Sequence, residues 1–386
     1  MKKMVFEYID AHREEMIELW REVVNIESGS GNKAGVDAVA ARFRQVIEQT
    51  GGLTRVIEMQ NAGNMLIGEF TGAKKDDGVA FMGHMDTVFP DGTVAKRPFS
   101  ISDGKAYGPG VLDMKGGIVA FLYAIKALKA AGYDARPLKI ILAGDEEVAH
   151  ANSDAAERFV QEAKGCAAAF NCETGFLNDG IVTGRKGTAV FTFEVKGVSV
   201  HAGNEPENGR SAILEMAHKV INIQKLTDYK IGITYNVGVI AGGIVPNAVP
   251  DYAKIKVDVR YIDPAQLMGI QSAMQKVADT VYVEGTSTTV VMEPGIAPMQ
   301  TTDGVKKLFE IVKKTYLENG WGNPYEKFVG GGSDSAYSVI AGVPTVCAMG
   351  VKGGRNHSAQ EFAVVETLFE RAKLLAASTL NLDVAE

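Results

Sequence analysis

The start of the chain carries apolar side chains at helical spacing. Met16, Leu19 and Val23 fall within residues 5–26 at intervals of three and four, and residues 36–49 repeat the pattern. Such spacing gathers apolar residues on one face of a helix, which can then pack against a core. We therefore expect two amphipathic helices to open the fold.

Short apolar or alternating runs follow these helices and are typical of strands. They are residues 53–59, 64–70, 79–82, 138–143 and 167–170. Helical patterns at residues 115–131 and 154–163 separate several of them. Alternation of strands with helices of this length predicts an α/β sandwich with a largely parallel sheet.

A different pattern begins near residue 187. The segment TAVFTFEVKG alternates apolar and polar positions, as a strand with one covered and one free face does. A helix, two strands, a helix and a strand are expected next, at residues 210–224, 233–240, 252–261, 264–277 and 287–292. This order is typical of a ferredoxin-like unit.

The α/β pattern resumes after residue 298, with a helix at 303–317, a strand at 343–349 and a helix at 364–380. We therefore expect residues 1–186 and 298–386 to form one α/β domain. Residues 187–297 would be inserted into it as an α+β domain. A length of 386 residues agrees with two domains, because a single core seldom grows that large.

Charge and composition narrow the class of protein. The net charge of -7, without any basic cluster, argues against a nucleic-acid partner. The apolar runs are too short to span a membrane, and acidic residues stand where a secretory signal would be apolar. Cys166, Cys172 and Cys347 lack metal-site spacing and fit a reducing compartment. We expect a cytoplasmic protein that acts on a small molecule.

Side chains able to bind metal follow three of the expected strands. These are His84 and Asp86 after the third run, Asp145, Glu146 and Glu147 after the fourth, and Glu173 after the fifth. Asp113 lies in the loop GPGVLDMKGG, just before a helix. In open α/β sheets the carboxyl ends of the strands border one crevice, so these side chains should converge there.

So many carboxylates at one place repel one another unless a cation neutralises them. Histidine nitrogen combined with carboxylate oxygen suits a hydrolytic zinc site. His357, in GGRNHSAQEF, would return to the same sheet edge. Five ligands around one bridging carboxylate would leave room for a pair of ions and a shared water.

Each of these residues has an ordinary interpretation when it is taken alone. An HxD pair, a Glu doublet or a surface histidine is common by chance, and only their joint placement indicates a metal site. His12 and His218 keep the ordinary interpretation. His150 follows the Glu doublet closely and is left undecided.

The motifs GHMDTV, GPGVLDMKGG, GDEE, ETG, VHAG, GGSDS and NHSAQEF occur in this order. Together, over nearly the whole chain, they resemble the two-zinc exopeptidase family of carboxypeptidase G, acetylornithine deacetylase, succinyl-diaminopimelate desuccinylase and aminoacylase. GGGSDSAY and the segment around His357 are most similar to the glutamate carboxypeptidase branch.

The resemblance implies roles for individual residues. His84 and Glu173 would hold one zinc ion, Glu147 and His357 the other, and Asp113 would bridge them. Glu146 would be the general base on a zinc-bridging water. Asp86 would orient His84. The peptide bond between Asp113 and Met114 is expected to be cis, as is frequent in this family.

The resemblance also makes residues 187–297 a lid and dimerisation domain. His201, in VHAG, would stabilise the oxyanion from the partner subunit of a homodimer, while Arg260 and Asn247 would bind the substrate. The chain departs from the family at Ser211, where asparagine is usual, and at His150, where a small residue is usual. The stretch 285–304 contains no Lys or Arg, which weakens a strict preference for glutamate.

The expected function is hydrolysis of the amide bond next to the C-terminal, glutamate-like residue of a small peptide. Two zinc ions would carry out the reaction, and cobalt or manganese could substitute for them. The alternative is a deacylase of N-acetyl- or N-succinyl-amino acids. An oxidoreductase is suggested by Gly108 and Gly110 but disfavoured by the intervening proline. A binding protein without activity is disfavoured because the whole catalytic set is intact.

Overall fold

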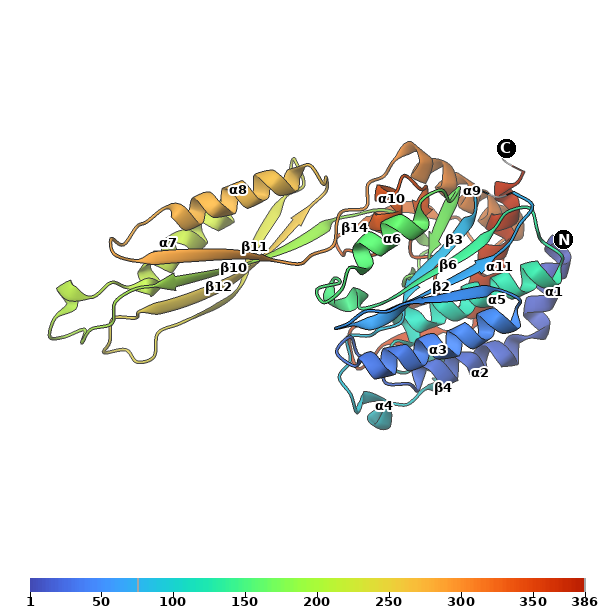
Figure 1. Ribbon diagram of the computed structural model, residues 1–386, viewed down its shortest axis with the longest axis horizontal. Helices are drawn as coiled ribbons and strands as arrows, with labels where there is room; N and C mark the ends of the chain where they lie inside the picture. Colours follow the sequence, from blue (N-terminus) through green and yellow to red (C-terminus); the bar gives the residue numbers. More distant parts are fainter. Residues whose placement is uncertain (75, 385–386) are drawn as a thin grey trace. The chain divides into compact units, whose positions relative to one another are not determined.

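The computed structural model describes residues 1–74 and 76–384 and divides into two compact units (Figure 1). The first unit comprises Met1–Gly184, Met299–Val329 and Ser333–Glu386. The second comprises Arg185–Pro298 and Gly330–Gly332. The second unit is therefore an insertion in the sequence of the first.

A six-stranded sheet organises the first unit, in the order β1, β2, β6, β3, β7, β15. The strands are β1 (Leu53–Ile57), β2 (Gly63–Phe70), β3 (Val79–His84), β6 (Leu138–Gly144), β7 (Ala168–Asn171) and β15 (Thr345–Val346). β6, β3, β7 and β15 run parallel, whereas β1 and β2 pair antiparallel at one edge. The predicted α/β class with a largely parallel sheet is confirmed.

The first unit also contains helices. They are α1 (Lys2–Ala11), α2 (Arg13–Val24), α3 (Lys33–Gln49), α4 (Thr93–Lys96), α5 (Gly116–Ala130), α6 (Ala155–Ala163), α9 (Asp303–Asn319), α10 (Ser335–Ile340) and α11 (Glu366–Leu382). Six of them (α1, α2, α3, α5, α9 and α11) share one hydrophobic core with the sheet. α5 is apolar around most of its circumference, as a helix buried on all sides must be.

The structure differs from the local predictions in three respects. The first helical stretch is divided at His12 into α1 and α2. The run at 343–349 contributes only Thr345–Val346 to the sheet. Two small sheets were not predicted. They are formed by β4 (Ser100–Ser102), β5 (Lys105–Tyr107), β17 (Phe362–Val364), β16 (Lys352–Gly354) and β8 (Gly175–Phe176), and by β9 (Gly180–Arg185) with β14 (Tyr325–Val329). Strands this short carry too few residues to show a period.

The second unit has the strand and helix order of a ferredoxin-like fold. Its elements are β10 (Gly187–Lys196), α7 (Ala212–Gln224), β11 (Thr234–Gly242), β12 (Tyr252–Tyr261), α8 (Gln266–Asp279) and β13 (Ser287–Glu293). The sheet order is β11, β12, β10, β13, with antiparallel pairing throughout. Burial alternates along β10 and β12, so one face of this sheet packs against its helices and has its own core.

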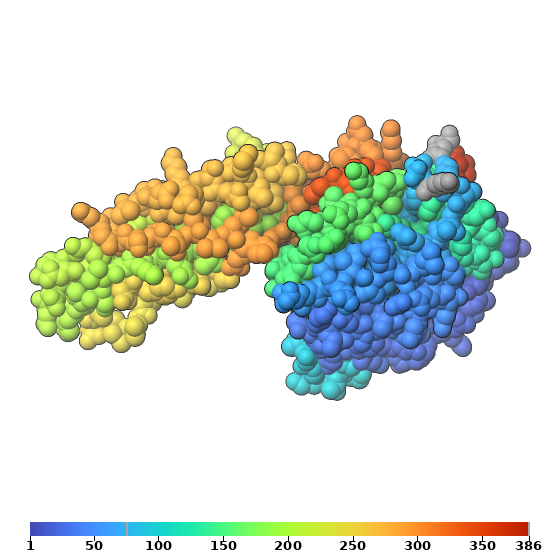
Figure 2. All heavy atoms as spheres, viewed as in Figure 1, coloured from blue at the N-terminus to red at the C-terminus, as the bar shows by residue number. Residues whose placement is uncertain are grey.

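Ser211, a departure from the family pattern, caps α7 by accepting a hydrogen bond from the Leu214 amide at 3.1 Å. None of the described helices combines the length and the apolar character needed to cross a membrane. Figure 2 shows that N-terminal residues, in blue, form much of the surface of the first unit in this view.

Candidate metal centre and active site

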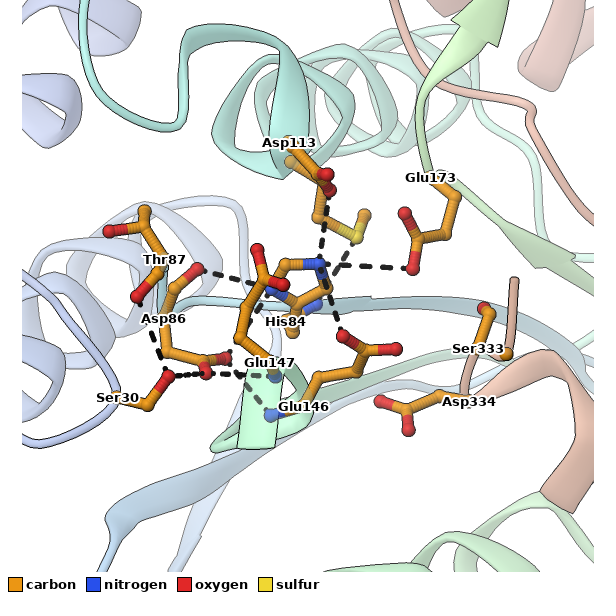
Figure 3. A network of polar contacts seen from close by, with 12 residues as sticks. Ser30, His84, Asp86, Thr87, Asp113, Glu146, Glu147, Glu173, Ser333 and Asp334 are labelled. Carbon is orange, nitrogen blue, oxygen red and sulfur yellow. Dashed lines mark hydrogen bonds and ion pairs between the residues drawn. The ribbon is translucent and has the colours of Figure 1, made fainter. Parts of the chain in front are cut away.

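The parallel strands β6, β3 and β7 end at the same edge of the sheet, and the candidate ligands follow them there. His84 is the last residue of β3, and Glu146 begins a short 3-10 turn after β6. Glu173 follows β7. Figure 3 shows these side chains pointing toward one another, with Asp113 approaching from the segment before α5.

His84, Asp113 and Glu173 form the first group of potential metal ligands. The Nε2 atom of His84 lies 3.4 Å from Asp113 Oδ1 and 3.8 Å from Glu173 Oε1. All three side chains are buried. These are three of the five residues to which the resemblance assigns metal ions, and the structure brings them together.

Asp113, Glu147 and His357 form the second group. His357 Nε2 lies 3.2 Å from Asp113 Oδ2 and 3.2 Å from Glu147 Oε2. The side chain of His357 is half exposed, so this group faces the solvent more than the first does. Asp113 belongs to both groups and presents one carboxylate oxygen to each histidine.

The donor set fits a pair of metal ions. The buried atoms His84 Nε2 and Glu147 Oε1 have no hydrogen-bond partner within the described part of the chain, and a buried polar atom requires one. Imidazole nitrogen with carboxylate oxygen suits zinc, and also cobalt or manganese. Hydrogen bonds to Asp113 and Glu147 raise the pKa of His357 to about 10. The carboxylates therefore favour a cation at this position.

Asp86 supports both the first histidine and the turn that carries the two glutamates. Its Oδ1 lies 3.4 Å from His84 Nδ1. The same carboxylate accepts hydrogen bonds from the backbone amides of Glu146 and Glu147, each at 3.1 Å, and from the Ser30 hydroxyl at 2.7 Å. Although burial alone raises the pKa of Asp86, the bonds from His84 and Ser30 hold it below its usual value. Asp86 thus contributes a buried anion that orients its neighbours.

Glu146 lies beside the first group with its Oε2 atom 4.0 Å from His84 Nε2. Burial raises its pKa well above the usual value, and the nearby carboxylates of Glu173 and Asp334 raise it further against the opposing effect of His84. A carboxylate with a raised pKa next to metal ligands has the properties of a general base that later returns its proton.

The loop that carries Asp113 is held by a residue that the sequence analysis did not single out. Glu361 is buried and accepts hydrogen bonds from the backbone amides of Leu112 (2.8 Å) and Asp113 (3.1 Å), and also from Gly110. The peptide bond between Asp113 and Met114 is cis, as expected. Glu361 lies in the motif NHSAQEF, but only the fold shows that it contacts this loop.

The sequence analysis also missed a buried cluster of His150, Asp145 and Asp334 near Glu146. His150, left undecided from the sequence, is buried with Asp145 at one ring nitrogen and Asp334 at the other. Asp334 belongs to the motif GGGSDS, which carried the family resemblance without a role for this residue. No local pattern relates residues 150 and 334, because their contact depends on the packing of α6 and α10.

The other three predicted site residues lie in the second unit. His201 is exposed, and its Nδ1 accepts a hydrogen bond from the Gly203 amide at 3.1 Å. Asn247 lies next to it in the fold, because its carbonyl accepts a bond from the Ala202 amide. Arg260 pairs with Asp258 at 2.9 Å and donates to the Gly330 carbonyl.

Known proteins resemble this chain over most of its length. Residues 80–381 match the family described as peptidase family M20/M25/M40. Carboxypeptidase G2 of a Pseudomonas species is 28% identical over 373 residues, 95% of this chain and 89% of the relative. Succinyl-diaminopimelate desuccinylase of a Nitratiruptor species is 25% identical and covers 73% of this chain and 78% of its own. The crystal structure of aminopeptidase PepT from Bacillus cereus superposes with a TM-score of 0.79 at 23% identity, covering 96% of this chain and 99% of the other.

Proposed function

The chain belongs to peptidase family M20/M25/M40, a family of metallohydrolases, and on that premise we propose that it is a two-zinc carboxypeptidase. It cleaves the amide bond that precedes the C-terminal, glutamate-like residue of a small peptide. The observation that carries the proposal is the position of Asp113, which presents one oxygen to His84 and the other to His357.

Five residues hold the metal ions in this proposal. His84 and Glu173 would hold one zinc ion and Glu147 and His357 the other, and Asp113, which belongs to both ligand groups, would be shared between them. Bound zinc supplies a Lewis acid that polarises the scissile carbonyl and lowers the pKa of the attacking water. The buried Nε2 of His84, which has no hydrogen-bond partner among the described residues, supports this assignment, as do the distances within the two groups.

Glu146 is the proton carrier of the reaction. It takes the proton from the attacking water and then delivers it to the nitrogen of the leaving amine, so that it ends each cycle as a carboxylate. Its burial and raised pKa support both halves of this role. Asp86 keeps the backbone of Glu146 and the ring of His84 in a fixed orientation.

We propose that the second unit supplies substrate contacts and acts as a lid. Arg260 pairs with the substrate carboxylate, to which its planar guanidinium can donate two parallel hydrogen bonds. Asn247 contributes a polar contact to the same substrate. His201 stabilises the developing oxyanion from the partner subunit of a homodimer.

Exposed apolar side chains on the second unit support the homodimer. Leu214 and Ile221 on α7 and Val239 and Ile240 on β11 are each about half exposed or more. β11 is an edge strand, whose backbone groups can pair with a second copy. Sedimentation of wild type and Ile221→Glu tests the dimer.

The three cysteines are free thiols, which supports a cytoplasmic location.

A deacylase of N-acetyl- or N-succinyl-amino acids is the second candidate. It uses the same metal groups and the same Glu146, and the similarity to a succinyl-diaminopimelate desuccinylase favours it. The two candidates differ in which side of the amide bond is recognised. Arg260 serves a free carboxylate in either case.

The test combines elemental analysis with hydrolysis of dipeptides and N-acyl amino acids, before and after chelation. About two zinc equivalents per chain and release of a C-terminal amino acid, abolished by the chelator and restored by zinc, support the carboxypeptidase. Preference for the acyl amino acids supports the deacylase. A metal-free protein that zinc does not activate overturns both.

A further inference from the structure

His150 ends the turn that carries Glu146 and Glu147. The turn begins at Asp145 and continues through the 3-10 segment Glu146–Val148. Ala149 and His150 both have a φ of 54°, a left-handed conformation that is unfavourable for residues other than glycine. Such a conformation persists where surrounding contacts hold it, and the side chain of His150 makes contacts of this kind.

Both nitrogens of the His150 ring contact a carboxylate. Nδ1 lies 2.8 Å from Asp145 Oδ1, and Nε2 lies 2.6 Å from Asp334 Oδ1. The Ser153 hydroxyl donates to the second oxygen of Asp145 at 2.7 Å. The three side chains of His150, Asp145 and Asp334 are almost completely buried.

The charge state of the ring follows from these contacts. A carboxylate only accepts hydrogen bonds, so both ring nitrogens must carry a proton to donate to Asp145 and Asp334. Although burial lowers the pKa of His150, the two aspartates raise it well above its usual value. The contacts therefore favour the charged form of the ring, whose hydrogen bonds to the two aspartates are then charge-assisted and strong.

The cluster joins two segments that border Glu146. Asp145 directly precedes Glu146, and the Glu146 carbonyl accepts the Ala149 amide at 2.7 Å within the same turn. Asp334 comes from the segment before α10, and Figure 3 shows its side chain beside that of Glu146. Loss of the ring would release the turn and leave two carboxylates without their shared cation.

We propose that His150 is a positioning residue that fixes Glu146 by joining Asp145 to Asp334 through its two ring nitrogens. The proposal rests on the proposed role of Glu146 as the proton carrier. Neither of the two ring contacts of His150 is to a member of the metal-ligand groups. His150 acts on Glu146 through the turn that begins at Asp145 and through the carboxylate of Asp334, which lies beside Glu146.

The experiment compares wild type with His150→Ala and with Ser153→Ala, which removes the other side-chain bond to Asp145. We expect His150→Ala to lower kcat by about tenfold or more, with KM and bound metal within about twofold of wild type, because misplaced catalytic groups are that costly. Hydrogen exchange of a peptide spanning residues 145–150 should become faster in the same variant. Ser153→Ala should leave kcat within about twofold.

Hydrogen exchange separates this proposal from the proposed function, because it does not require turnover. Suppose that wild type hydrolyses no substrate, yet exchange at residues 145–150 is faster in His150→Ala. The proposed function is then refuted, while the role of His150 in holding the turn is supported. Unchanged exchange at residues 145–150, or unchanged kcat, overturns the positioning role. If His150→Ala does not fold, His150→Leu, which is similar in size but has neither ring nitrogen, is measured in the same way, and wild-type exchange and kcat in that variant refute the proposal.

Discussion

Asp113 Oδ2 lies 3.2 Å from His357 Nε2, although one residue precedes the inserted unit in the sequence and the other follows it. The other oxygen of the same carboxylate lies 3.4 Å from His84 Nε2. A single side chain is thus shared by two ligand groups. Changes at Asp113 should therefore affect metal binding at both proposed sites together.

Replacing Asp113 with alanine is expected to reduce bound zinc more than replacing His357. His357→Ala should retain about one equivalent per chain, because the buried group of His84 and Glu173 keeps its own ligands. Asp113→Ala should retain well below that amount. Elemental analysis after gel filtration measures both, with Asp91→Ala, a surface carboxylate, as the control. Equal metal loss in the two variants would argue against a shared ligand.

Glu146→Gln should separate metal binding from catalysis. Glutamine preserves the shape of the side chain but cannot take up the proton of the attacking water. We expect kcat to fall by about 100-fold or more, while the zinc content stays within about 20% of wild type. Single-turnover hydrolysis and elemental analysis provide the two readouts. Substantial turnover in this variant would remove Glu146 from the reaction.

Glu361→Ala should weaken metal binding without removing any ligand. Glu361 accepts the amides of Gly110, Leu112 and Asp113, so its loss frees the loop that aims the shared carboxylate. Losses of about 10- to 100-fold in metal affinity are typical when such supporting contacts are removed. Competition with a chromogenic chelator measures the affinity. Glu366→Ala, which alters an exposed carboxylate, is the control. Equal metal affinities in wild type, Glu361→Ala and Glu366→Ala would contradict the role of Glu361 in holding the loop.

The His150 cluster should make stability depend on pH in a defined direction. The folded-state pKa of His150 is raised well above 6.5. A raised pKa adds stability that is fully present below the unfolded value and is lost as the pH rises through the folded value. As the pH rises above about 6.5, the free energy of unfolding of wild type relative to His150→Gln should therefore fall, by at most about 1.4 kcal/mol per pH unit. Denaturant titrations at several pH values measure it, and a difference that stays constant or grows with pH contradicts the charged state.

Arg260→Ala tests the proposed contact with the substrate carboxylate. We expect KM to rise by about tenfold or more for substrates with a free carboxylate, because a charge-assisted hydrogen bond is lost. KM should change little for the matching C-terminal amides. Lys256→Ala removes a cation from the same strand and serves as the control. An equal rise for acids and amides would show that Arg260 only supports the fold, through Asp258 and Gly330.

The main elements of the fold were predictable where their patterns are long. Burial alternates along β10 as apolar and polar residues do in the sequence, and α5 is apolar on nearly every side. The break at His12 was not predictable, because apolar spacing continues across it from Ile9 to Met16. The short strands β16 and β17 pair with the distant strands β8 and β5. Their residues carry no period of their own.

By itself, the sequence determined which side chains follow which buried strands, because apolar runs and the residues that end them are local features. It therefore indicated His84, Glu146 and Glu173 together, and the α/β class that places them at one edge. Only the tertiary structure decided that Glu361 holds the Asp113 loop and that His150 joins Asp145 to Asp334. The contacts of Glu361 with the Asp113 loop and of His150 with Asp334 join segments far apart in the chain, and they depend on packing that no local pattern encodes.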